Sequence, residues 1–169
     1  EVYFLLHPNR EGGRVIIAAV IVGGEPFEPF LEGEDALRIP LPSTLQPGEA
    51  VDIRIEFTVE MPEDPGGYYG LLGFSKNVLL LNNFYPVIPV YDDEGWNLES
   101  PPPYSDTTYL DASFYLVRVT APEDLVLVAS GVQSERQTQS GQQTALFAAG
   151  PVREFYLACT HGLFTGSAI

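Results

Sequence analysis

Apolar and polar residues alternate most regularly between positions 51 and 60. Five apolar side chains occupy every second position: Val51, Ile53, Ile55, Phe57 and Val59. The positions between them carry Asp, Arg, Glu or Thr. Successive side chains of a β-strand point to opposite faces, so this stretch predicts a strand with one buried face and one hydrated face.

Shorter apolar runs predict further strands at residues 2–6, 15–22, 25–31, 36–41, 108–120, 125–129, 144–149 and 155–160. The run at 15–22 is continuous and β-branched, so we expect it to be buried on both sides. Gly and Pro separate these runs, and no amphipathic helix is evident. About ten strands at such spacing predict an all-β fold, an antiparallel β-sandwich or saddle-like twisted sheet, with 1–169 as a single domain.

The connections between the runs are of several kinds. Residues 68–81 predict a hairpin with its turn at 75–77, and the polar stretch 133–143 is interpreted as a hairpin loop. Residues 8–13 and 62–67 read as a loop and a turn, and 100–103 as a polyproline II spacer. Pro86 and Pro89 exclude a regular central ladder at 82–91, because proline donates no backbone hydrogen bond.

The long strand expected at 108–120 divides its apolar side chains between two faces. Tyr115, Val117 and Val119 fall on one face, and Phe114 and Leu116 on the other. A hydrophobic content of 45% with 19 Phe and Tyr residues indicates a folded chain, since disordered chains are poor in such residues.

The net charge of −15 restricts the partners of the chain. An acidic surface repels phosphate, so nucleic acid and direct contact with an anionic membrane are disfavoured. The simplest role of the charge is solubility, and the alternative is attraction of cationic groups such as peptide amines or Ca²⁺. The acidic group Asp92, Asp93 and Glu94, with Asp106 and Asp111 downstream, is interpreted first as a solvated turn, because its spacing does not match an EF-hand.

Motifs for catalysis are missing from the sequence. It contains no H-E-x-x-H, no G-x-S-x-G and no phosphate-binding glycine loop. His7 and His161 are the only histidines, which excludes a three-histidine zinc site within the chain. Cys159 is the only cysteine and lies in an apolar run, so we expect a buried, unreactive thiol. We therefore expect no catalytic residue, metal ligand or cofactor in this chain.

Four stretches, taken together and in order, resemble the N-terminal β domain of zinc aminopeptidases of the membrane alanyl aminopeptidase family, especially a bacterial branch. Residues 1–9 (EVYFLLHPN) resemble its Y-P-N-like strand end, and 39–49 (IPLPSTLQPGE) its L-x-P-G-E loop. Residues 83–92 (NFYPVIPVYD) are similar to N-W-Y-P-x-x-x-V-Y-D. Residues 111–131, with a proline at 122 and A-S-G at the end, are similar to its hairpin.

The resemblance implies a non-catalytic domain that packs on a separate catalytic domain and shapes the pocket for a peptide's N-terminal residue. The zinc ion would belong to that catalytic domain, and peptide would be the substrate. The start at Glu1 is interpreted as a cut within a longer chain whose first strands are trimmed. The resemblance implies a bacterial parent and leaves open whether it is secreted or membrane-tethered.

The aromatic segment between positions 68 and 109 contains the candidates for the substrate cleft. Its aromatic side chains serve either sheet packing or a binding surface. The residues predicted to lie nearest the cleft are Asn82, Asn83, Tyr85, Tyr91 and Trp96. Two other functions fit the sequence: a carbohydrate-binding or adhesion-type β-sandwich, and a non-enzymatic scaffold derived from the aminopeptidase fold.

Overall fold

The computed structural model describes residues 1–62, 72–99 and 109–161, and nearly all of its regular structure is β. The described part contains fifteen strands and one short helix, and every strand pairing is antiparallel. The predicted fold class is therefore confirmed. The expected number of about ten strands is wrong, because several strands have only two to four residues and carry too short a pattern to be recognised.

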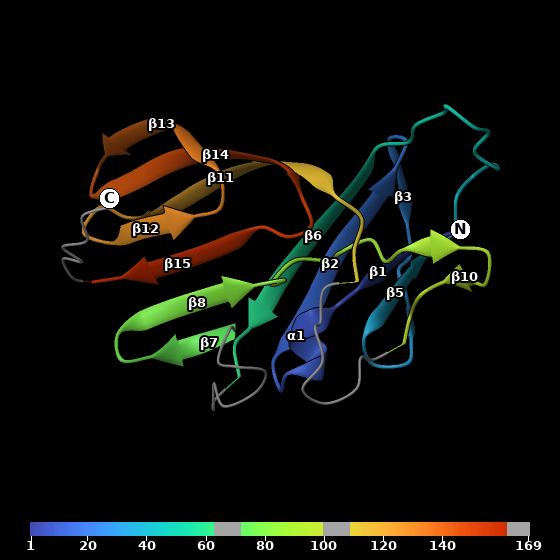
Figure 1. Cartoon of the computed structure of the whole chain (residues 1–169), viewed down its shortest axis with the longest axis horizontal. Coiled ribbons are helices and arrows are strands. Elements are labelled where there is room, and N and C mark those ends of the chain that lie inside the picture. Colours follow the sequence, from blue (N-terminus) through green and yellow to red (C-terminus); the bar gives the residue numbers. More distant parts are fainter. Residues whose placement is uncertain (63–71, 100–108, 162–169) are drawn as a thin grey trace.

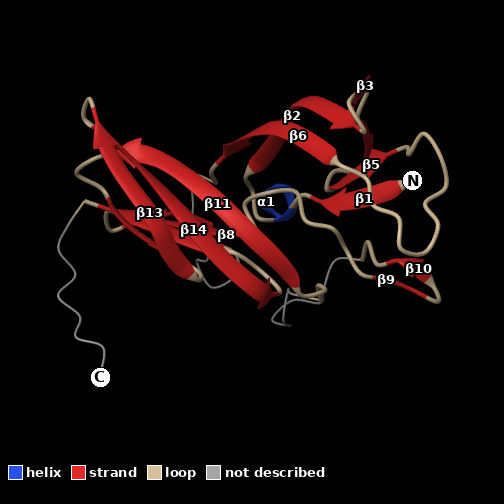
Figure 2. Ribbon diagram, turned by 90° about the horizontal axis from the view of Figure 1, so that it is seen from above, coloured by secondary structure: helices blue, strands red, loops and turns tan. Residues whose placement is uncertain are grey.

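Two lobes lie side by side, each built on its own hydrophobic core (Figures 1 and 2). We define the first lobe as residues 1–62 and 86–99. Its strands are β1 (Val2–Leu5), β2 (Arg14–Val22), β3 (Glu25–Phe27), β4 (Phe30–Glu32), β5 (Ala36–Ile39), β6 (Ile53–Glu60), β9 (Tyr91–Asp92) and β10 (Gly95–Trp96). They form two three-stranded sheets, ordered β1-β5-β4 and β3-β2-β6, and the β9-β10 hairpin.

We define the second lobe as residues 72–85 and 113–161. Its strands are β7 (Leu72–Ser75), β8 (Val78–Asn82), β11 (Ser113–Pro122), β12 (Val126–Ala129), β13 (Val132–Gln139), β14 (Gln142–Val152) and β15 (Tyr156–Thr160). They form a three-stranded sheet ordered β11-β14-β13 and a four-stranded sheet ordered β12-β15-β8-β7. Both sheets contribute to one core, so this lobe is a small β-sandwich.

The alternation at 51–60 predicted β6 correctly. Its apolar side chains pack against the core of the first lobe, and its polar ones are exposed. The expectation that residues 15–22 are buried on both sides is wrong. Val15, Val20 and Val22 of β2 are buried, but Ile16 is 39% exposed, because the core packs against only one face of this sheet.

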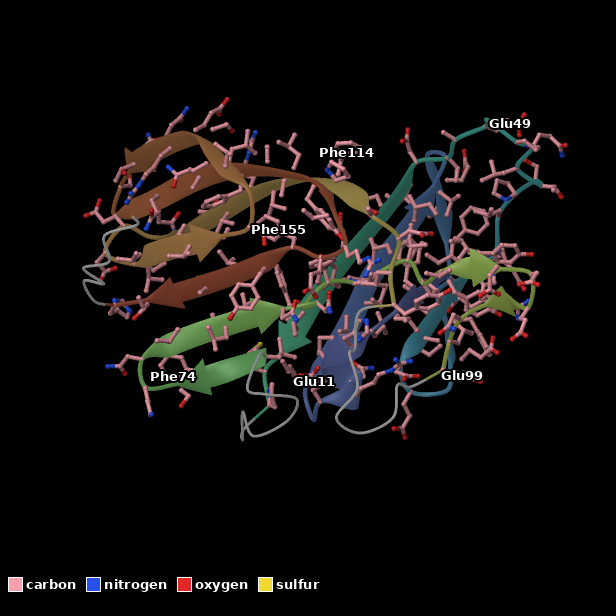
Figure 3. The ribbon with its side chains drawn as sticks, viewed as in Figure 1. Glu11, Glu49, Phe74, Glu99, Phe114 and Phe155 are labelled. Atoms are coloured by element: carbon pink, nitrogen blue, oxygen red, sulfur yellow. The ribbon has the colours of Figure 1, made fainter. Side chains whose placement is uncertain are left out.

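β11 also has the two faces expected from the sequence. Tyr115, Val117 and Val119 pack in the second core, whereas Phe114 and Leu116 are 82% and 72% exposed. Figure 3 shows Phe114 at the surface and Phe155 between the two sheets. The outward face of this strand is therefore apolar where it begins.

Two hairpin turns require left-handed backbone. The turn between β7 and β8 is confirmed at Lys76 and Asn77, whose φ angles are 50° and 62°. Residues 133–143, interpreted as a loop, instead form β13, the turn Ser140-Gly141 and the start of β14. Every residue of β13 is exposed, so burial imposes no apolar alternation on this edge strand.

The loop expected at residues 8–13 begins with a four-residue helix, α1 (His7–Arg10). Pro8 lies in its first turn, where its fixed φ suits a helix and its missing N–H is not needed. The turn closes when the N–H groups of Glu11 and Gly13 donate to the Pro8 carbonyl at 3.1 and 2.9 Å. No helix among the described residues is long and apolar enough to span a membrane.

The segment after β8 joins the two lobes. It forms no regular ladder, as Pro86 and Pro89 predicted, but Val87 and Leu5 exchange two backbone hydrogen bonds of 2.7 and 3.0 Å. These bonds hold the segment that enters the first lobe from β8 against β1. The turn expected at 62–67 falls largely outside the described residues, as do the start of the 68–81 hairpin and the 100–103 spacer.

Candidate functional site

The five residues predicted to face a cleft lie in two separate places. Tyr91 and Trp96 face each other across the β9-β10 hairpin of the first lobe. Asn82, Asn83 and Tyr85 lie at the end of β8 and in the segment after it. The structure thus gathers the two hairpin residues at one groove, and the other three belong to the second lobe.

The groove beside the hairpin has a volume of about 1000 Å³ and is open to solvent. We call it the hairpin groove. Its walls come from three segments: Glu1 and Val2, residues 41–45, and Tyr91, Gly95 and Trp96. Sequence reasoning missed the wall formed by residues 41–45, whose polar turn residues resemble those of any connecting loop.

Aromatic rings form the firm wall of this groove. The Tyr91 and Trp96 rings meet edge to face, with centroids 5.0 Å apart. Trp96 also packs on Tyr3 of β1 at 6.0 Å and belongs to the first core. Tyr91 is 65% exposed. The wall therefore combines an anchored indole with a ring that is free to contact a ligand.

The two lobes differ strongly in charge. The first lobe has fifteen acidic and four basic side chains, a net charge of −11, whereas the second has four of each. At the groove, the Glu1 carboxylate pairs with Arg38 at 2.5 Å, so its charge is compensated. The hairpin turn carries Asp92, Asp93 and Glu94, all exposed, and none forms an ion pair within the described residues.

Asn82 and Asn83 are not on the groove. Asn83 is buried with a φ of 47°, and its Nδ2 donates to Glu154 at 3.3 Å. The Oδ1 atoms of both asparagines are buried without a hydrogen-bond partner. The structure therefore gives them a place inside the second lobe rather than on an open surface.

Tyr85 is a packing residue in the second lobe. Its ring contacts Phe84 and Tyr115 at 5.2 and 5.8 Å, and its hydroxyl accepts the Phe155 N–H at 2.8 Å. Burial, and to a smaller extent the hydrogen bond with Tyr115, raises the pKa of Tyr85 above its usual value. The ring also lines a small cavity of about 240 Å³ between the lobes.

The described residues offer no set of metal ligands. No three His, Cys, Asp or Glu side chains within the described ranges lie close enough to hold an ion. His7 is buried in α1, and burial followed by the charge of Arg10 lowers its pKa to about 4. His161 lies beside Asp124 at 3.2 Å. Cys159 is buried, and burial raises the pKa of its thiol. A zinc ion does not fit this part of the chain.

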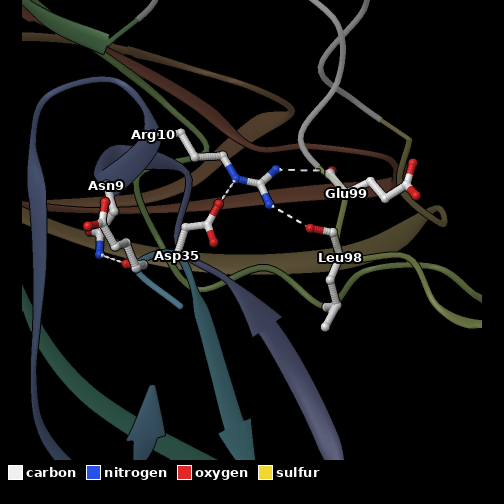
Figure 4. A network of polar contacts seen from close by, with 6 residues as sticks. Asn9, Arg10, Asp35, Leu98 and Glu99 are labelled. Atoms are coloured by element: carbon white, nitrogen blue, oxygen red, sulfur yellow. Dashed lines mark hydrogen bonds and ion pairs between the residues drawn. The ribbon is translucent and has the colours of Figure 1, made fainter. Parts of the chain in front are cut away.

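A polar network holds the hairpin against the rest of the first lobe (Figure 4). The Arg10 guanidinium pairs with Asp35 and donates to the carbonyls of Leu98 and Glu99 at 3.0 and 3.4 Å. Both carbonyls follow β10, so Arg10 fixes the chain that leaves the groove. Nothing in the spacing of Arg10 and Asp35 along the sequence indicated this pairing.

No protein-family profile and no curated protein matches the sequence. Solved structures match the fold. The M1 zinc metallopeptidase from Deinococcus radiodurans is 18% identical with a TM-score of 0.60, and the match covers 92% of this chain and 33% of that one. The same enzyme as a mutant bound to a Tyr-Ser-Ala substrate gives 19% identity and a TM-score of 0.52 over the same shares.

The matching part is the N-terminal portion of those chains. This chain therefore spans about a third of the length of the solved structures that it matches. It has the β fold of the N-terminal part of bacterial M1 zinc metallopeptidases, as the four sequence stretches indicated.

Proposed function

We propose that this chain is the non-catalytic N-terminal domain of a zinc metallo-aminopeptidase. The observation that supports this most strongly is the fold match, which covers 92% of this chain but only 33% of the metallopeptidase. The order of the four sequence stretches points to the same family. Metal-dependent hydrolysis would belong to polypeptide outside this domain, so we assign no catalytic role to its residues.

In the intact protein the domain would pack on the catalytic domain and shape the pocket for a peptide's N-terminal residue. The second lobe suits the packing role, since it has no net charge and exposes Phe114, Leu116 and Val132. The last strand of the described residues, β15, also belongs to this lobe. Among the five predicted residues, Tyr91 and Trp96 line the hairpin groove, and Tyr85 lines the smaller cavity between the lobes.

An activity assay tests the proposal. The 169-residue chain and the longer parent protein are incubated with aminoacyl substrates, with and without a metal chelator. We expect no turnover by the chain and chelator-sensitive turnover by the parent. Chelator-resistant peptidase activity of the chain alone would contradict the proposal, as would a parent that shows no metal-dependent activity.

A further inference from the structure

The hairpin groove has the size and chemistry of a peptide-binding site. A volume of about 1000 Å³ is far more than one small ion or side chain needs. Extended peptides that contain proline dock in grooves lined by aromatic rings, because their backbone is already close to the bound conformation. The exposed Tyr91 ring, supported by Trp96, provides such a lining.

The negative charge around the groove favours a positively charged ligand. The first lobe has a net charge of −11, and the hairpin turn between Tyr91 and Gly95 carries three carboxylates that form no ion pair within the described residues, those of Asp92, Asp93 and Glu94. The Glu94 N–H donates to Asp92 Oδ1 at 3.0 Å, which stabilises the turn of the hairpin. A field of this sign attracts cations, and an ammonium or guanidinium group can also lie over an aromatic face.

We propose that the hairpin groove binds an extended, positively charged peptide segment, with a Lys or Arg side chain over the Tyr91 and Trp96 rings. The acidic turn attracts the segment, and the aromatic wall and the 41–45 loop hold it. The proposal concerns the same groove to which the proposed function points, but it can fail separately, because every residue of the site lies in this chain and binding is measured without the parent protein.

Fluorescence provides a direct test, because Trp96 is the only tryptophan of the chain. The chain is titrated with a blocked Lys-Pro peptide and with Gln-Pro and Glu-Pro peptides of equal length. We expect a saturable change in Trp96 emission with the lysine peptide. The glutamine peptide should bind with an affinity at least about tenfold lower, and the glutamate peptide should not bind. Added salt should weaken binding of the lysine peptide.

Two tyrosine variants separate a built groove from general attraction to an acidic protein. Tyr91→Ala removes the exposed wall without changing the charge, and Tyr109→Ala removes a tyrosine of similar exposure, 61% against 65%, outside the groove. We expect Tyr91→Ala to weaken binding about tenfold and Tyr109→Ala to leave it unchanged. Equal affinities in the two variants would overturn the proposal, and circular dichroism checks that both fold.

A neutral oligosaccharide serves as the last arm of the test. Salt-independent binding of the sugar at Trp96, with no preference for the lysine peptide, would overturn the peptide assignment in favour of a carbohydrate site.

Asp93→Asn supplies the charge control, because it removes one carboxylate and leaves the aromatic wall in place. We expect a loss of affinity of about two- to fivefold for the lysine peptide.

Discussion

The two lobes have similar sandwich-like cores, but the side chains on their outward faces differ in polarity. On β6 of the first lobe the outward side chains are Arg54, Glu56, Thr58 and Glu60, whereas on β11 of the second lobe they begin with Phe114 and Leu116. The first lobe has a net charge of −11 and the second has none. Two equally regular strand patterns can therefore serve different surroundings. The outward residues are polar on β6 and apolar at the start of β11, which is the contrast that the proposed packing role of the second lobe would explain.

The largest expected loss of stability comes from a comparison of a buried and an exposed phenylalanine in the second lobe. Phe155 is fully buried between the sheets, whereas Phe114 is 82% exposed. Phe155→Ala should lower the free energy of unfolding by about 4 kcal/mol, and Phe114→Ala by less than about 0.5 kcal/mol. Urea denaturation measures both. Similar losses in the two variants would mean that Phe114 is also part of a core.

Acid should affect the first lobe first. His7 titrates at a pKa of about 4 when folded, against 6.5 ordinarily, so the folded protein holds it neutral. The contribution of neutral His7 to the free energy of unfolding is complete above pH 6.5. It is lost as the pH falls toward 4, by at most about 3 kcal/mol. As the pH is lowered between these values, the protection factors of the backbone amides against hydrogen exchange should fall in β1 and β2 before they fall in β14 and β15. His7→Gln should remove most of that difference.

Two glycines of the second lobe test how closely its strands pack. A Cβ on Gly131 would lie 2.1 Å from the Ala148 carbonyl oxygen, whereas one on Gly141 meets nothing within 4 Å. Both have positive φ, so both alanine variants carry backbone strain of about 1 kcal/mol. We expect Gly131→Ala to cost about 2 kcal/mol more than Gly141→Ala in thermal unfolding. Equal costs would show that the backbone at Gly131 relaxes freely.

The smallest expected change in stability comes from the outward face of β11. A double variant with Phe114→Ser and Leu116→Thr should unfold within about 0.5 kcal/mol of the wild type, since both side chains are exposed. It should bind much less of a hydrophobic dye than the wild type does, because the exposed apolar side chains are removed. The control Thr58→Ser on β6 should leave dye binding unchanged. A large loss of stability in the double variant would place these side chains in the lobe's own packing.

Much of the fold could be predicted because burial imposes a pattern on the sequence. The alternation of β6, the two faces of β11 and the positive-φ turn at Lys76 and Asn77 all follow from local rules. β13 could not be recognised, because an edge strand without burial needs no apolar residues. The helix α1 was missed because four residues are too few to show a helical period.

The candidate site was predictable only in part. Tyr85 and Tyr91 lie six residues apart in one aromatic segment, yet one is packed in the second core and the other is exposed beside the hairpin groove. The difference depends on what comes from elsewhere in the chain. Phe155 and Tyr115 contact Tyr85, and residues 41–45 line the groove beside Tyr91. Sequence order alone does not supply these neighbours.

The irregular pairing between β13 and β14 has a consequence for how the hairpin keeps its alignment. The register shifts between Gln133 and Glu135, and the hairpin closes at Ser140-Gly141. Polar side chains exposed on both faces would gain or lose little if β13 slid along its partner by one residue. The register shift near Gln133 at one end and the tight turn at Ser140-Gly141 at the other therefore fix the alignment of β13 with β14.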